Sequence, residues 1–394
     1  MNIKNFAPSV QSELKVNPDG HTLLHLVPLE GLRGMTAIYV VIIHAFQQAV
    51  ITPSNFSGFT KFFLGFFSVG HYAVDVFIVL SGFCLMLPVI RNNGQIRGTI
   101  KQFFFRRARR ILPPYYAAII LSLGLIFITA IGNPTGRPWD VTLPVNYQAV
   151  ISHIFLIHDL FKETCMKING PLWSIAVEFR MYLMFPLLVI FWRRLGGVST
   201  ILWASIIARI TFYICSKISF INVDPIGPSF HYVTLFCLGM LAAETTFSNS
   251  EFSTNLKKNI PWNLLSISTF VFAIPAYQLL NKDGQEWIIA DILVGFSSMS
   301  LLIALFTGRS FMNRLLECKP LVTIGSFSYS LYLVHSPILQ VFIHYVLDPL
   351  SLSPNLHLIV LSLIGFPCVL IVSYVFFLAF EKPFLSNTAK IKSK

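Results

Sequence analysis

The sequence predicts an all-α integral membrane protein with about ten transmembrane helices and both termini in the cytoplasm. Hydrophobic residues make up 55% of its 394 positions, and charged residues only 12%. A soluble domain carries roughly 25% charged residues, because its surface must face water. The mean hydropathy of +0.68 agrees with a surface that mostly faces lipid. This composition excludes a disordered, collagen-like, coiled-coil or disulfide-rich secreted protein.

Ten apolar segments follow one another along the chain, separated by short polar connectors. Each has about the 20 residues that a helix needs to cross a bilayer. We therefore expect one transmembrane domain over residues 29–384, between an N-terminal tail (1–28) and a C-terminal tail (385–394). The shorter apolar stretch 151–158 is expected to be interfacial or re-entrant. The predicted helices cover residues 31–50, 72–90, 112–131, 171–192, 198–216, 230–247, 260–280, 287–307, 321–347 and 356–380.

The orientation follows from the Lys and Arg residues outside these segments, because cytoplasmic loops carry an excess of them. With the N-terminus inside, most of the 29 Lys and Arg residues lie on the cytoplasmic side. The net charge of +12 therefore indicates membrane orientation rather than nucleic-acid binding. The six cysteines are scattered and show no metal-ligand spacing, so neither a metal site nor a disulfide framework is predicted.

Four ionisable residues fall inside the segments at a similar predicted depth, toward the outer face: His44, Asp75, Glu178 and Arg180. Such groups are costly in a bilayer, so each needs a reason to be there. The structural alternatives are a core imidazole for His44 and ion pairs or helix-end solvation for the others. Because Glu178 and Arg180 are two positions apart on one helix, they do not face each other, and at least one needs a partner elsewhere.

A second charged feature is the run of residues 103–110, which holds four Arg in five positions and lies close to Arg33 in the predicted topology. Clustered Arg side chains can bind phosphate with paired donors. The same run would serve as an anchor that contacts anionic lipid headgroups. On charge alone, the anchor is favoured.

Six short motifs occur in order along residues 29–384. They are Leu29–Gly34 followed by His44, Val74–Phe83, Arg107-x-x-Arg110, Pro171–Tyr182, Gly325–His335 and Glu381–Phe384. Together they resemble the membrane-bound acyltransferase family 3, of the O-antigen and exopolysaccharide O-acetylase type. Glu30 stands where that family more often has Asp, and Arg180 lies at a position where the family varies.

The resemblance implies ten transmembrane helices in a bacterial inner membrane. It also implies transfer of an acyl group, usually acetyl, from cytoplasmic acetyl-CoA to a hydroxyl of a cell-surface carbohydrate or its lipid-linked precursor. No metal is implied. Many relatives carry an SGNH hydrolase-like domain after the last helix. We expect none here, which leaves open whether a separate periplasmic partner completes the transfer.

The resemblance also assigns roles. His44 becomes the catalytic imidazole, acting as general base or accepting the acyl group, with Glu178 or Asp75 orienting it. Arg33 and His44 are 11 residues apart on one helix, or about 16 Å, which is comparable with an extended pantetheine arm. The expected donor-binding residues are Arg33, Arg107 and Arg110. The residues expected to bind substrate or support the structure are Trp173, Arg180, Tyr182, Tyr329, His335 and Glu381.

Two other functions remain open from the sequence. A transporter or flippase could use the intramembrane charges as a proton relay, although such proteins often show internal repeats and none is visible here. An acyltransferase acting on a small molecule or on peptidoglycan would carry the same residues.

Overall fold

The computed structural model describes residues 14–16, 22–24, 26–49, 58, 70–223, 230–280, 287–308 and 311–385. Most of the two predicted tails lies outside these residues. Within them, eight helices are long and apolar enough to cross a membrane. Two shorter apolar helices, Tyr232–Phe247 and Trp262–Ala276, complete a set that matches the ten predicted segments one by one. The all-α membrane fold is thereby confirmed, whereas the cytoplasmic location of the termini stays a prediction.

The helices that correspond to the predicted segments are α2 (Val27–Gln48), α4 (Tyr72–Arg91), α5 (Ile100–Ile128), α7 (Trp173–Leu195), α8 (Gly197–Cys215), α9 (Tyr232–Phe247), α11 (Trp262–Leu280), α12 (Trp287–Thr307), α15 (Ser328–Phe342) and α17 (Phe366–Phe376). Short π-helical turns extend α15 and α17, giving spans Ser328–Leu350 and Asn355–Phe384. The remaining α-helices and strands are α6 (Tyr147–Ile154), α10 (Glu251–Asn259), α13 (Phe311–Leu316), α14 (Lys319–Ser326), α16 (Pro354–Val360), β1 (Leu14–Val16) and β2 (Thr22–Leu24), and the two strands pair antiparallel. The apolar stretch 151–158 forms the end of α6 and the start of a 3-10 turn, too short to span a bilayer.

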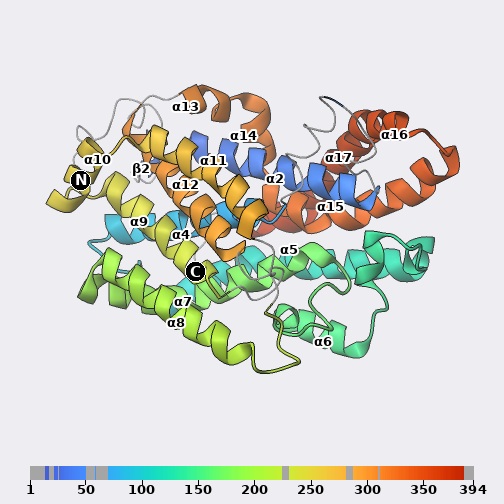
Figure 1. Cartoon of the computed structure of the whole chain (residues 1–394), viewed down its shortest axis with the longest axis horizontal. Coiled ribbons are helices and arrows are strands. Elements are labelled where there is room, and N and C mark those ends of the chain that lie inside the picture. Colours follow the sequence, from blue (N-terminus) through green and yellow to red (C-terminus); the bar gives the residue numbers. More distant parts are fainter. Residues whose placement is uncertain are drawn as a thin grey trace, which may run out of the picture.

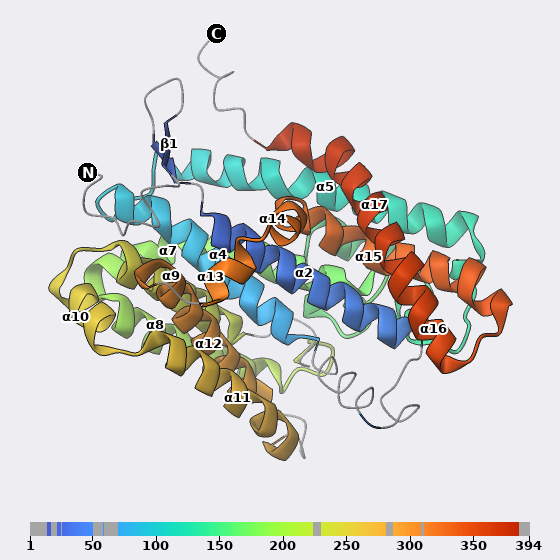
Figure 2. The same cartoon turned by 90° about the horizontal axis from the view of Figure 1, so that it is seen from above.

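Helix α2 lies between two groups of helices (Figure 2). In one group α4 packs along α9, α9 along α12, and α12 along α11. In the other, α15 packs along α5 and α17. Helix α6 lies at the lower edge in Figure 1, on the opposite side of the molecule from α13 and α14. The central position of α2 brings Arg33 and His44 into contact with segments that are far away in the sequence.

Helix α5 begins earlier than predicted, at Ile100 instead of residue 112. A capping box sets this start: the Thr99 hydroxyl accepts from the Gln102 backbone N–H at 3.2 Å, and the Gln102 side chain accepts from the Thr99 N–H at 3.1 Å. The helix also continues through Pro113 and Pro114, as membrane helices can when neighbouring groups satisfy the freed carbonyls. The arginine run therefore lies on a helix that continues into the membrane.

Glycines let α2 approach the segment before α15 at backbone distance. A Cβ at Gly34 would overlap the backbone carbonyl of Leu321, and one at Gly325 would overlap that of Glu30. This contact fixes the position of α2 relative to α14, and α15 follows α14 directly.

We expect Gly34→Ala and Gly325→Ala each to lower the free energy of unfolding by about 1–3 kcal/mol, because the added methyl group forces the two backbones apart. Thermal unfolding of the purified protein in detergent measures the change. Gly124→Ala is the matched control, since a Cβ there meets nothing within 4 Å. An equal loss of stability at Gly124 would show that the effect is not due to the close contact.

Candidate active site

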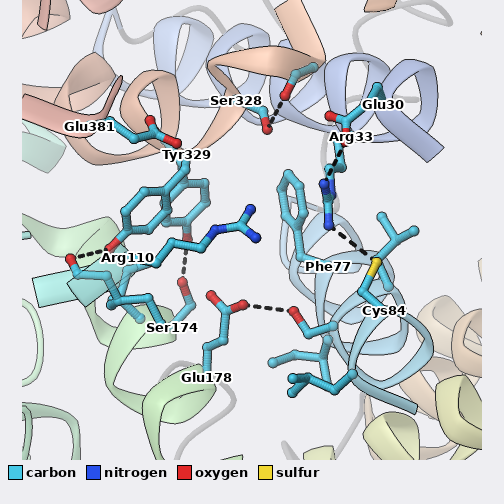
Figure 3. A pocket seen from close by; sticks show the side chains of 18 of the residues that line it. Glu30, Arg33, Phe77, Cys84, Arg110, Ser174, Glu178, Ser328, Tyr329 and Glu381 are labelled. Carbon is cyan, nitrogen blue, oxygen red and sulfur yellow. Dashed lines mark hydrogen bonds and ion pairs between the residues drawn. The ribbon is translucent and has the colours of Figure 1, made fainter. Parts of the chain in front are cut away.

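A cavity of about 410 Å³ lies among α2, α4, α5, α7 and the segment from α14 into α15 (Figure 3). Its size falls within the usual range for small-molecule sites. Charged and hydroxyl-bearing side chains line much of it, which is unusual for a space between apolar helices. The charged residues are Glu30, Arg33, Arg107, Arg110, Glu178 and Glu381.

Arg33 enters the cavity from the first turns of α2. Its guanidinium donates to Glu30 Oε1 at 2.9 Å and to Cys84 Sγ on α4 at 3.2 Å (Figure 3). The motif residue Glu30 therefore holds the arginine of the same motif in place. Cys84 was not singled out by sequence reasoning, because a lone cysteine in an apolar helix carries no signal.

Arg107 and Arg110 enter the cavity from α5, and Arg110 extends into it in Figure 3. The Arg107 Nε is buried and has no hydrogen-bond partner among the described residues. A buried, unpaired guanidinium nitrogen is costly, so it is a candidate for an anionic ligand group. Arg106 and Arg109, the other two arginines of the run, do not line the cavity, although Arg110 is itself as exposed to the outside as they are. Two arginines of the run thus line the cavity and two do not.

The carboxylates of two motifs support the cavity wall. Glu178 accepts from the Ser81 hydroxyl at 2.7 Å and from the Tyr182 hydroxyl. Glu381 accepts from the backbone N–H of Ser330 at 3.1 Å and from its hydroxyl at 2.5 Å. The backbone contact ties the last motif to the first turn of α15.

Three further cavity residues form the wall nearest to His335. The Tyr332 ring lies 5.7 Å from the His335 ring and 6.0 Å from that of Phe77. The Tyr332 hydroxyl lies 2.6 Å from Ser174 Oγ. Tyr332 therefore has the arginine-lined cavity on one side and an imidazole on the other. Sequence reasoning missed Tyr332, Phe77 and Ser174, although all three lie within the quoted motifs.

His44 and His335 form a close pair that joins α2 to α15. His44 Nδ1 lies 2.6 Å from His335 Nε2, and the two ring planes are parallel to within 8° with their centroids 4.9 Å apart. His335 is fully buried, whereas His44 is partly exposed. Among the described residues, the hydrogen bond of the His44 ring goes to His335 and not to Glu178 or Asp75. The expected orienting carboxylate is thus replaced by a second imidazole.

Asp75 belongs to a different cluster. Its carboxyl lies beside that of Asp291 on α12, and both residues are fully buried. The Asp291 carboxylate in turn accepts from His71 Nε2 and His231 Nε2, each at 2.9 Å. The predicted depth of Asp75 therefore did not bring it to His44, because depth along a helix says nothing about which neighbour the residue faces.

Within the described part of the chain, no group of three or more His, Cys, Asp or Glu is arranged to hold a metal ion.

Arg180 and Trp173 also lie outside the cavity lining. Arg180 forms a two-point ion pair with Asp159, which follows α6. Burial lowers the pKa of the adjacent His158 to about 3, so this ring is neutral and stacks on His153 with centroids 3.7 Å apart. Trp173 stacks on Tyr232, with centroids 6.1 Å apart. These contacts hold α7 against its neighbours, whereas Tyr182 and Tyr329 do line the cavity.

Known proteins resemble this chain at the level of a family and of individual relatives. The acyltransferase domain family matches residues 27–378. The O-acetyltransferase OatA of Staphylococcus aureus (strain NCTC 8325 / PS 47) is 26% identical over 327 residues, which is 80% of this chain and 51% of that protein. The putative O-acetyltransferase SACOL0978 of S. aureus (strain COL) is 23% identical over 331 residues, with the same shares. The chain thus spans about half the length of these curated relatives. No solved structure matches.

Proposed function

Because this chain belongs to acyltransferase family 3, we propose that it is a membrane O-acetyltransferase. The donor would be cytoplasmic acetyl-CoA, and the acceptor a hydroxyl of a cell-surface carbohydrate or its lipid-linked precursor at the bacterial cytoplasmic membrane. One observation carries the proposal: the cavity that holds Arg33, Arg107 and Arg110 is also lined by Tyr332, which contacts His335, the partner of His44.

The arginines would bind the phosphates of the donor. Guanidinium groups match phosphate oxygens with two parallel hydrogen bonds, and low dielectric around the cavity strengthens them. Arg107 fits this role best because its Nε lacks a partner among the described residues. With the phosphates held there, an extended arm about 16 Å long could present the thioester at the depth of His44 on the same helix as Arg33.

His44 would act as the general base on the acceptor. The hydroxyl oxygen forms a bond to the thioester carbonyl carbon while its proton passes to the imidazole. The carbon–sulfur bond then breaks, and the imidazole returns the proton to the leaving thiolate. The products are an acetyl ester and the free thiol of CoA, so no proton or electron is left over. A site shielded by packed helices also limits hydrolysis of the thioester by water.

Sidedness tests the proposal. Inverted membrane vesicles expose the cytoplasmic face, so we expect external acetyl-CoA to acetylate envelope glycan fragments enclosed in the lumen. The predicted orientation puts the arginines toward the donor and His44 toward the acceptor. Radiolabelled acetyl-CoA and release of free thiol provide the two measurements. Acetylation only when donor and acceptor share one compartment would contradict transfer across the membrane, and no thiol release in either arrangement would contradict the proposed reaction.

A further inference from the structure

His335 is hydrogen-bonded at both of its ring nitrogens. Its Nδ1 lies 2.8 Å from the backbone carbonyl oxygen of Tyr332 and 3.2 Å from that of Leu331. Carbonyl oxygens only accept hydrogen bonds, so Nδ1 must carry a proton. Both carbonyls belong to the preceding turn of α15, which fixes this end of the ring within its own helix.

The other ring nitrogen of His335, Nε2, then determines the tautomer of His44. A neutral imidazole has one N–H, so His335 with a proton on Nδ1 has a lone pair on Nε2. This lone pair faces His44 Nδ1 at 2.6 Å. His44 must therefore donate from Nδ1, which leaves its own lone pair on Nε2. Burial of His335 favours the neutral ring that this arrangement needs, because an isolated charge is costly away from water.

A second side-chain hydrogen bond between α2 and α15 helps to keep the two imidazoles next to each other. One turn beyond His44 on α2, the Gln48 side-chain amide donates to the hydroxyl of Ser336 at 2.7 Å. Ser336 is the residue after His335. The close glycine contact with α14, which α15 follows directly, restrains α2 near its other end. These contacts keep α2 and α15 at the distance that the hydrogen bond between His44 and His335 requires.

We propose that His335 is a positioning residue that holds His44 in the tautomer with its proton on Nδ1 and its lone pair on Nε2. This inference rests on the proposed function, in which His44 takes the proton of the acceptor hydroxyl. In the opposite tautomer, Nε2 would carry a proton and could not accept another. His335 itself exchanges no proton with the substrate; its effect is to make one nitrogen of His44 the base. An imidazole thus takes the place that a carboxylate has in a Ser-His-Asp triad.

Three substitutions at His335 separate positioning from packing. The terminal amide of Gln reaches the place of Nε2, so the oxygen of His335→Gln can accept from His44. The shorter amide of His335→Asn reaches only the place of Nδ1, and His335→Met fills the space without a strong acceptor. We expect His335→Gln to keep kcat within about 10-fold of the parent. His335→Asn and His335→Met should lose about 100-fold or more, as expected when a general base is badly oriented.

The apparent KM for acetyl-CoA should change little in all three variants, because His335 does not line the arginine cavity. Nitrogen-15 NMR of histidine-labelled protein adds a direct readout: His44, identified by loss of its signals in His44→Asn, should show a protonated Nδ1 and an unprotonated Nε2. His335→Met should disturb that pattern. Equal kcat for the Gln and Met variants, or a protonated Nε2 in the parent protein, would overturn the inference. Full activity of His44→Asn would instead overturn the proposed function.

Discussion

Replacing His44 by Ala should abolish acetyl transfer while the protein still folds and inserts. In the proposed reaction His44 takes the proton of the acceptor hydroxyl, and a positioned general base contributes about 10²–10⁴-fold. We therefore expect kcat/KM to fall about 1,000-fold, which is in the middle of that range. The assay is acetylation of glycan fragments by radiolabelled acetyl-CoA. The structure supports the role because the His44 ring is partly exposed and joined to the wall of the arginine cavity through His335 and Tyr332.

His44→Asn is the sharper form of this experiment. The Asn amide can take the place of Nδ1 and donate to His335, so the contact between α2 and α15 is kept while the base is removed. Tyr39→Phe, on the same helix but lining a separate apolar cavity, should stay active. Thermal unfolding in detergent checks that all three variants are folded. Near-normal acetylation by His44→Asn would rule out the imidazole as the base.

The sequence predicted the helices well, because the physics of a bilayer leaves few alternatives. A segment without water must form its hydrogen bonds internally, so each long apolar stretch becomes a helix. The predicted start of α5 was wrong by 12 residues, because the prediction followed hydropathy and the arginine run 106–110 is polar. The local signal was nevertheless present in Thr99 and Gln102, whose spacing is that of a capping box.

The candidate site was harder to predict, since a sequence gives depth along a helix but not the direction in which a side chain points. Arg33, Arg107 and Arg110 do line one cavity. Asp75, at the predicted depth of His44, faces Asp291 instead. The pairing of His44 with His335 joins residues 291 positions apart, and no spacing rule connects them. It arises from packing of α2 against α14 and α15, which depends on Gly34 and Gly325.

Loss of the cavity arginines should weaken donor binding. A hydrogen bond to a charged group contributes about 1.5–3 kcal/mol, and each 1.4 kcal/mol is a factor of about ten in affinity. We therefore expect Arg107→Ala and Arg110→Ala each to raise the apparent KM for acetyl-CoA about 10- to 100-fold. Initial rates over a range of acetyl-CoA concentrations, at fixed acceptor, measure this change.

The arginine run provides its own control, because its members differ in location and not in charge. Arg109 lies one position before Arg110 on α5 and is exposed like it, but it does not line the cavity. If the run serves only as a membrane anchor, Arg109→Ala and Arg110→Ala should lower membrane insertion equally and leave KM unchanged. If Arg110 binds donor phosphate, Arg109→Ala should keep the parent KM while Arg110→Ala does not. Arg110→Lys sharpens the distinction: it keeps the anchoring charge but not the two parallel hydrogen bonds, so its KM should stay close to that of Arg110→Ala.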